Sequence, residues 1–274
     1  MSLSRTKAGF PDIILSLWDN LPLVRQMVKR EIIGRYRGSF FGLLWSFFNP
    51  VLMLTVYTFV FSIVFKARWG QGNGDKFEFA LLLFAGLIVF NLFSECVSRA
   101  PGLILSNVNY VKKVIFPLEI LPWVTLGSAL FHAAISLTVL LIFLAAVNPV
   151  VSWTILLLPV VVLPLLPLIM GLSWLLASIG VFVRDIGQFI GMVMTVLMFM
   201  SPIFYPASAL PESVRAYLFL NPLTFIIEQA RDVMIWGKLP NWNGLAIYSV
   251  IAILVAWAGL WWFEKTRKGF ADVL

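Results

Sequence analysis

Apolar residues along this chain gather into six long stretches, which short polar or charged segments separate. The stretches are Leu43–Phe65, Phe79–Ser98, Trp123–Val147, Ile155–Ile179, Gly187–Tyr205 and Gly244–Phe263. Each has roughly the 20 residues that an α-helix needs to cross a bilayer. Because hydrocarbon offers no water to backbone N–H and C=O groups, apolar runs of this length are expected to be helical. The pattern predicts an all-α membrane protein with six transmembrane helices.

The charge distribution argues against a soluble domain. Between Pro117 and Val183 only Glu119 is charged, and a soluble domain with such a stretch would expose an oily surface. The composition agrees, with 61% hydrophobic and 12% charged residues, against about 45–50% and 25% in soluble domains. Within the fourth stretch, Pro159, Pro164 and Pro167 predict a broken helix.

Lys and Arg residues predict the orientation. Of the 20 in the chain, fourteen fall on the side that holds both termini and six on the other side. Since cytoplasmic loops carry the excess of basic residues, both termini are expected in the cytoplasm. The predicted organisation is a cytoplasmic N-terminal segment over residues 1–42, a six-span domain over 43–263 and a cytoplasmic tail over 264–274.

An amphipathic helix is predicted before the first span. It begins with Asn20 as cap and Pro22 in the first turn. An apolar stripe recurs at helical spacing, and basic residues occupy the remaining surface: Leu21, Val24, Val28, Ile32 and Tyr36 against Arg25, Lys29, Arg30, Arg35 and Arg37. Such a helix is expected to lie in the headgroup layer, where anionic lipid attracts it. The plainer interpretation is an anchor that orients the first span.

Residues 207–238 are too apolar for a free outer loop and too charged for a span. Two short helices are predicted there, the second capped by Asn221 with Pro222 at its first position. A pair of re-entrant helices, shielded by protein or by a water-filled cavity, fits both facts. Glu228, Arg231 and Asp232 share one face, where mutual neutralisation is favoured over substrate contact.

The sequence contains little catalytic chemistry. There is no G-x-x-x-x-G-K-[ST] phosphate loop, so ATP hydrolysis by that route is excluded for this chain. Cys96 is the only cysteine, so neither a disulfide nor a multi-cysteine metal site is expected. His132 has no partner nearby in sequence and is interpreted as structural rather than as a proton relay. Glu95 and Glu119 lie near span ends and are also interpreted as structural.

Aromatic residues leave a choice open. Tyr57 and Phe61 lie at helical spacing on the first span, where sugar rings can stack on them, although ordinary helix packing is the favoured interpretation for each. The loop over about 104–116 is predicted to contain a short helix that ends at Pro117. That helix is either a simple connector or a contact for a partner beneath the membrane.

Several ordered segments resemble one family. They are the run from Arg30 to Trp45 (REIIGRYRGSFFGLLW) with Asn49-Pro50, the loop from Lys112 to Pro122, Val183–Gly187 (VRDIG), Ser201–Tyr205 (SPIFY) with Leu210-Pro211, and Asn221-Pro222 followed by Arg231. The chain resembles, over residues 23 to 236, type-2 ABC permeases that export polysaccharides. Any one segment is weakly specific, but five in the same order are specific.

The resemblance implies a homodimer that rests on two copies of a separate ATPase, in the bacterial inner membrane. It implies export of a lipid-linked glycan such as O-antigen, capsule or teichoic-acid precursor, with ATP and Mg bound by the partner and no cofactor, metal or nucleic acid on this chain. The roles expected for individual residues are ATPase coupling for Asn109, Tyr110, Lys112 and Lys113; a lipid-pyrophosphate entrance at Arg30, Arg35, Arg37 and Arg184; channel lining by Tyr57, Phe61, Phe199 and Tyr205; and an outer gate at Asn221, Glu228 and Arg231.

Three alternatives remain at this point. A type-2 ABC permease that exports a drug or lipid would have a closed apolar dimer interface rather than an aromatic channel. A membrane-embedded glycan-processing enzyme would need convergent acids or a metal site, and the sequence suggests none. A purely structural scaffold would need neither the coupling loop nor the re-entrant helices.

Overall fold

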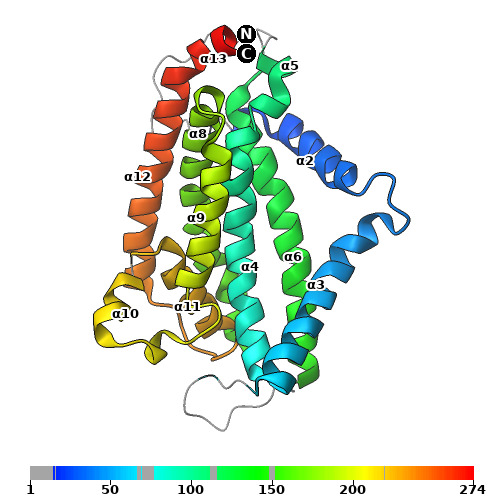
Figure 1. Cartoon of the computed structure of the whole chain (residues 1–274), viewed down its shortest axis with the longest axis vertical. Coiled ribbons are helices and arrows are strands. Elements are labelled where there is room, and N and C mark those ends of the chain that lie inside the picture. The colour runs from blue at the N-terminus through cyan, green and yellow to red at the C-terminus, as the bar shows by residue number, and fades with distance from the viewer. Residues whose placement is uncertain are drawn as a thin grey trace.

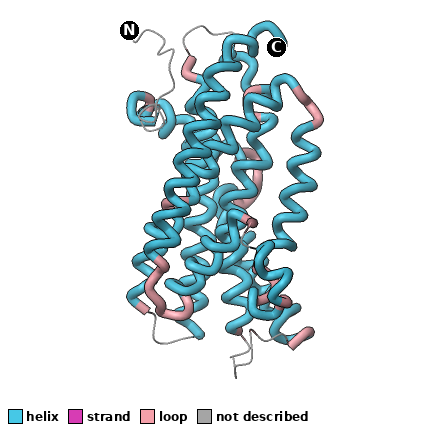
Figure 2. The backbone as a smooth tube through the Cα atoms, turned by 90° about the vertical axis from the view of Figure 1, so that its left-hand side faces the viewer, coloured by secondary structure: helices cyan, strands magenta, loops and turns pink. Residues whose placement is uncertain are grey.

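The computed structural model describes residues 15, 17–66, 69, 77–111, 116–147, 152–218 and 220–274. Within these residues every regular element is a helix, and the long helices run along the long axis of the molecule (Figures 1 and 2). The all-α prediction is confirmed for the described part of the chain.

Five helical segments are long and apolar enough to cross a membrane. They are Gly42–Val64, Glu78–Gly102, Leu118–Val147, Trp153–Phe182 and Trp242–Val273. They correspond to five of the six predicted spans. The first combines η1 (Gly42–Leu44), α3 (Trp45–Tyr57) and a π-helical segment, η2 (Thr58–Val64). The others contain α4 (Glu78–Arg99), α6 (Leu121–Val147), α8 (Leu165–Phe182) and α12 (Trp242–Thr266).

The fifth predicted stretch is shorter than expected. Helix α9 covers Ile186–Met200, and its 15 residues extend about 22 Å at 1.5 Å each, less than the roughly 30 Å of a hydrocarbon core. The predicted end at Tyr205 is wrong, because Pro202 disfavours helical backbone at Ser201, whose φ and ψ are −83° and 148°. The chain then turns away through Pro202 and Ile203.

The fourth span is broken, as the prolines predict. It consists of η6 (Trp153–Leu157), α7 (Leu158–Val162) and α8, with a turn at Leu163 and Pro164. Small residues then allow α8 to cross α12 closely. A Cβ at Gly259 would meet the Gly171 backbone, and a Cβ at Gly171 would meet the Val255 backbone. This close approach is typical of helix pairs in membranes.

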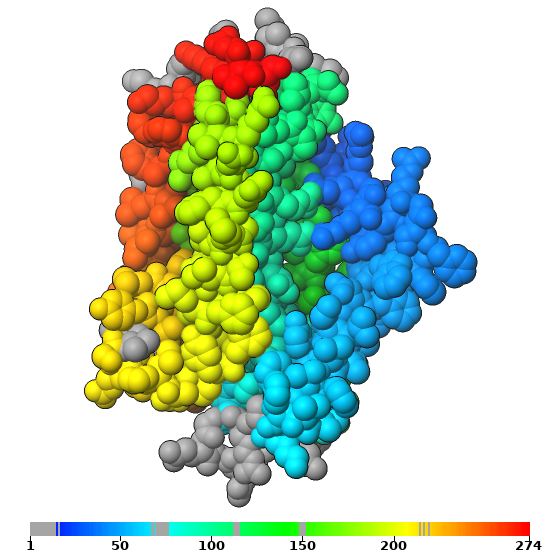
Figure 3. All heavy atoms as spheres, in the orientation of Figure 1, coloured from blue at the N-terminus to red at the C-terminus, as the bar shows by residue number. Residues whose placement is uncertain are grey.

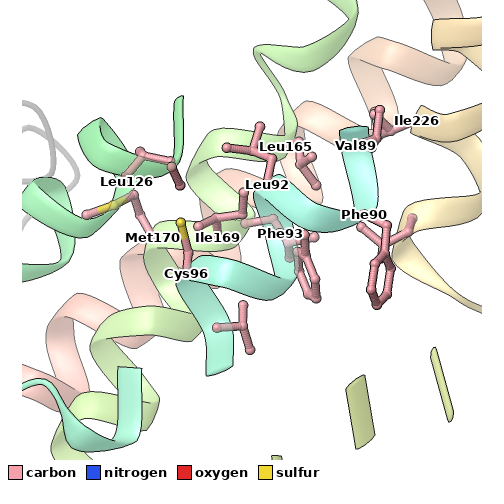
Figure 4. Close-up of a cluster of buried hydrophobic side chains, with 14 of the residues drawn as sticks. Val89, Phe90, Leu92, Phe93, Cys96, Leu126, Leu165, Ile169, Met170 and Ile226 are labelled. Carbon is pink, nitrogen blue, oxygen red and sulfur yellow. The ribbon is translucent and has the colours of Figure 1, made fainter. Parts of the chain in front are cut away.

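Helix α4 is the centre of the bundle. Its span is 83% buried, whereas the first span is only 11% buried. Figure 4 shows α4 side chains, among them Phe93 and Cys96, packed against Leu126 of α6 and Ile169 of α8. Cys96 is a buried free thiol. The first span therefore lies at the periphery, with most of its apolar surface uncovered.

Shorter elements lie at the two ends of the bundle. Helices α5 (Val108–Val111) and α13 (Phe270–Val273) mark one end, called here the α5 end, and α2 (Leu21–Arg35) projects sideways near it (Figure 1). Helices α10 (Glu212–Leu218) and α11 (Pro222–Met234) lie at the opposite end, called here the α11 end. The remaining elements are 3₁₀ turns: Ala100–Gly102, Leu105–Asn107, Leu118–Ile120, Ala207–Ala209 and Arg267–Gly269.

Candidate transport sites at the two ends of the bundle

The apolar stripe of α2 packs on α6. Val24 is buried against Ile120 and Val124. Val28 presses onto Gly127, where a Cβ would lie 2.6 Å from a Val28 methyl group. The predicted helix is confirmed, and two residues of its apolar stripe contact this part of the bundle. Its position in the headgroup layer stays a prediction. Part of the stripe, at Val24 and Val28, is covered by protein, and the basic residues of α2 are exposed.

An ionic cluster joins α2, α4 and α6 near the α5 end; its members are Glu31, Arg35, Glu95, Arg99 and His132. Arg35 forms an ion pair with Glu95, and Arg99 forms one with Glu31. Arg99 also forms an ion pair with Glu95, whose Oε1 lies 3.7 Å from Arg99 Nη1. Because α2 and α4 each contribute charges that the other compensates, the cluster holds the C-terminal half of α2 against the bundle.

His132 lies at the centre of these contacts. Its Nδ1 is 3.1 Å from the Arg35 guanidinium and 3.4 Å from Glu95, and its Nε2 is 3.2 Å from the Tyr36 hydroxyl. Burial raises the pKa of the Tyr36 hydroxyl. The sequence suggested no partner for His132. The only available signal was the rule that ionisable residues inside membranes find partners.

The four predicted entrance residues do not form one contact group. Arg35 belongs to the ionic cluster, whereas Arg30 and Arg37 lie exposed on and just after α2. Arg184 lies exposed on the turn between α8 and α9. Within the described residues, no hydrogen bond or ion pair joins these three arginines to Arg35. What they share is exposure of a cation near the α5 end.

The predicted coupling segment is described in part. Helix α5 follows a 3₁₀ turn at Leu105–Asn107, and Asn109 on it is exposed. Tyr110 stacks on Phe116 with ring centroids 4.2 Å apart. Lys112 and Lys113 lie outside the described residues. The coupling role of all four stays a prediction.

Arg267 fastens the end of that segment to the C-terminal part of the chain. It donates to the Phe116 carbonyl at 3.0 Å and to Glu119 Oε2 at 2.8 Å. The Trp174 indole donates to the Glu119 carbonyl at 2.9 Å. Glu119, which the sequence suggested to be structural, therefore joins the coupling segment to α8 and to the end of α12.

At the α11 end, Arg231 is almost completely buried, with 3% of its surface exposed. Its guanidinium donates to the carbonyls of Leu82 at 2.8 Å and Ile203 at 3.1 Å, and also to that of Pro202. Gly86 provides the space, since a Cβ there would lie 2.8 Å from Arg231 Nη2. Arg231 thus satisfies backbone acceptors on α4 and on the turn that follows α9.

The interpretation that Glu228, Arg231 and Asp232 neutralise one another does not describe Arg231. In the described part of the chain Arg231 forms no ion pair with either acid. Asp232 instead lies 3.8 Å from Lys238 and accepts from Gln229 at 3.4 Å. Glu228 is half-buried. The partners of Arg231 include the carbonyls of Pro202 and Ile203, where helix α9 has ended. The periodicity of the sequence could not reveal them.

Asn221 holds the turn that follows α9. Its side-chain oxygen accepts from Leu223 N at 2.9 Å, which confirms the predicted cap with Pro222 in the first turn. Its amide donates to Ser201 Oγ at 2.8 Å. Two of the three predicted gate residues, Asn221 and Arg231, therefore hold the chain just after α9. A gating role for the three stays a prediction.

Three of the four predicted channel residues lie around Phe204, which the sequence did not single out. Phe61 is 6.3 Å and Phe199 5.6 Å from its ring centroid. Tyr205 donates its hydroxyl to the Phe199 carbonyl at 3.0 Å. Tyr57 is half-buried against the main core. Phe199 is 59% exposed, so of these rings it is the most available to a ligand or a second chain.

Further aromatic residues extend the group toward Arg231. Phe61 stacks on Phe79 at 5.3 Å, and Phe79 lies 5.5 Å from Trp69. The Arg231 guanidinium carbon is 4.5 Å from the Trp69 ring centre, a cation–π contact. The rings expected in a channel and the arginine expected in a gate are thus parts of one connected group.

Comparison with known proteins shows the family of the chain. A family model described as "ABC-2 type transporter" matches residues 22–235. The O-antigen export system permease protein RfbA of Myxococcus xanthus is 30% identical over 262 residues, covering 95% of this chain and 98% of that protein. A Klebsiella pneumoniae RfbA is 24% identical over 90% of this chain and 93% of its own length. The polysialic acid transport protein KpsM of Escherichia coli is 23% identical, over 86% of this chain and 91% of its own. The chain belongs to the ABC-2 type transporter family.

Proposed function

We propose that this chain is the membrane subunit of an ATP-driven exporter that moves a lipid-linked polysaccharide, of O-antigen or capsule type, across the bacterial inner membrane. The observation that carries the proposal is the position of α2. It leaves the side of the bundle near the α5 end before the chain turns back into α3 (Figure 1). Exposed Arg30 and Arg37 therefore lie where a diphosphate headgroup arrives sideways from the bilayer.

The relatives support this cargo. The two RfbA proteins are named for O-antigen export and KpsM for polysialic acid transport, and each alignment covers more than four fifths of this chain. With both termini in the cytoplasm, the α5 end faces the cytoplasm. The basic face of α2 then lies at the inner leaflet, the side on which a cytoplasmic lipid-linked glycan begins its transfer.

A separate ATPase supplies the energy in this proposal. The chain has no phosphate loop, so ATP and Mg²⁺ bind to two partner subunits beneath the α5 end. Asn109, Tyr110, Lys112 and Lys113 form the contact with that partner. The hydrogen bonds from Arg267 to Phe116 and Glu119 connect this contact region to the end of α12 and so support it.

Two copies of the chain form the channel. Large apolar side chains lie uncovered on the first span and on α9. Among them are Phe59 and Ile63 on η2, and Met192 and Phe199 on α9. Figure 3 shows both helices on one face. Pairing two such faces buries this surface and places α9, the fifth of six spans in this proposal, beside the Phe61–Phe204–Phe199 group. A long glycan needs a continuous path, and flat rings allow sugars to slide past. Re-entrant α10 and α11 close the outer end.

The test reconstitutes this chain with its separately encoded ATPase in vesicles. ATP hydrolysis and transfer are measured with a lipid-linked glycan, with the lipid carrier alone and with a lipophilic drug. Stimulation by the glycan only is expected, and Arg30→Glu with Arg37→Glu should reduce transfer strongly. The matched control is Lys238→Glu, an exposed charge reversal at the α11 end.

Two outcomes contradict the proposal. Equal stimulation by the drug or by carrier alone would favour a drug or lipid permease. Unchanged transfer by the arginine variants would reduce α2 to an orientation signal.

A further inference from the structure

A groove of about 710 Å³ lies between α2 and α6. Its lining is apolar: Val28 and Ile32 come from α2, Leu126 and Leu130 from α6, Leu43 from the start of the first span and Leu166 from α8. Neither α4 nor α9 lines it. The groove is therefore separate from the ionic cluster and from the exposed face of α3 and α9.

An apolar molecule is the expected occupant of this groove. Water has almost no polar groups to bind there, and apolar cavities stay dry. If the groove were empty, the side chains that line it would lose dispersion contacts on the side that faces the groove. The volume corresponds to roughly two dozen waters at about 30 Å³ each, which is room for a long alkyl chain.

Two cations border this apolar space. Arg25 and Lys29 contribute to its lining and lie four residues apart on α2, and both are exposed. Like charges at this spacing destabilise a helix unless an anion lies near both. Among the described residues no carboxylate pairs with either side chain. An apolar groove with two unpaired cations at one rim is complementary to a molecule with a hydrocarbon chain and an anionic head.

We propose that this groove binds an anionic phospholipid of the bilayer. An acyl chain fills the space between α2 and α6, and the phosphate lies between Arg25 and Lys29. The site is distinct from the proposed channel beside α9, because it is lined by α2, α6 and α8 and not by α9. The lipid fills the space between α2 and α6 that protein side chains leave unfilled. The inference holds for any cargo, so it does not depend on the proposed function.

The experiment measures retained lipid. The chain is purified from the membrane and placed in nanodiscs of phosphatidylglycerol and phosphatidylcholine, and phospholipids that survive dilution into detergent are counted by native mass spectrometry. We expect one phosphatidylglycerol for each chain. Arg25→Gln with Lys29→Gln should weaken retention about thirtyfold, if each basic residue contributes as it does near anionic surfaces. Arg30→Gln with Arg37→Gln is the matched control, because it removes the same charge from the same region outside the groove.

A second variant keeps the test decisive if the first fails to fold. Leu130→Trp fills the groove from α6 without changing charge, and its side chain is partly exposed. It should displace the lipid while thermal unfolding shows a folded chain. Retention of phosphatidylcholine as well as phosphatidylglycerol, equal loss in the control variant, or full retention by Leu130→Trp would overturn the proposal. Recovery of a polyprenyl-linked glycan in place of phospholipid would assign the groove to the cargo and overturn it also.

Discussion

Replacing Arg231 by Met should weaken the fold at the α11 end. The guanidinium donates to the carbonyls of Leu82 and Ile203 at 2.8 and 3.1 Å and to that of Pro202. Met has a similar apolar stem and no donor, so the change removes hydrogen bonds and leaves the bulk. The three carbonyls belong to segments more than a hundred residues apart, on α4 and after α9. The bonds therefore act on tertiary structure and not on α11 itself.

The expected size follows from the count of bonds. A buried acceptor left without a donor costs about 1–3 kcal/mol, and polar contacts between membrane helices average about 0.6 kcal/mol. Three bonds then give a range from about 2 to about 9 kcal/mol. Removing Arg also relieves the cost of burying its charge, which lowers the upper limit. We expect a loss of about 2–5 kcal/mol in the free energy of unfolding.

The assay is thermal unfolding of the purified chain, followed by tryptophan fluorescence. A loss of this size should lower Tm by about 4–20 °C, at about 2–4 °C for each kcal/mol in large domains. Arg231→Lys should recover only part, since one ammonium group cannot reach three carbonyls in a fixed fork. Lys238→Met is the control, an exposed cation 3.8 Å from Asp232, and should change Tm by little. Equal Tm for Arg231→Met and Lys238→Met would refute the reasoning.

Three further predictions concern other parts of the chain. Glu95→Gln removes the carboxylate that compensates Arg35 and Arg99, so trypsin should cleave within α2 faster. The control is Glu212→Gln, which is exposed at the α11 end, and equal cleavage rates would show that the cluster does not hold α2. Tyr110→Ala with Lys113→Ala should abolish co-purification of the ATPase while membrane insertion stays intact, and survival of both association and export would reduce the loop to a connector. In a Cys96→Ser background, cysteines at 57 and 61 should react with water-soluble thiol reagents when the exporter is open, with Phe199→Cys as an exposed reference. Protection in every nucleotide state would place both side chains in the packed core.

Much of the local structure could be predicted from the sequence, because it depends on rules that act over a few residues. Apolar length predicts four spans to within five residues at each end, and the last span at its start, although that helical segment continues past Phe263 to Val273. Asn221 followed by Pro222 predicts the start of α11, and the prolines around Pro164 predict the interrupted fourth span. The same rules placed the fifth span correctly at its start. Its end was missed because the mostly apolar run continues past Pro202 to Tyr205, and the length of the run ignores the local effect of that proline.

Only the tertiary structure decided which polar side chains meet. Arg35 and His132 are 97 residues apart in sequence, and Arg231 and Leu82 are 149 apart. Periodicity assigns a residue to a face of its own helix but says nothing about the height or rotation of the neighbouring helix. In the interior a charge must find a partner, and backbone carbonyls freed by a break compete with carboxylates for that place. The partners of Arg231 and His132 were therefore set by helix packing, which brings together groups that local pattern leaves unrelated.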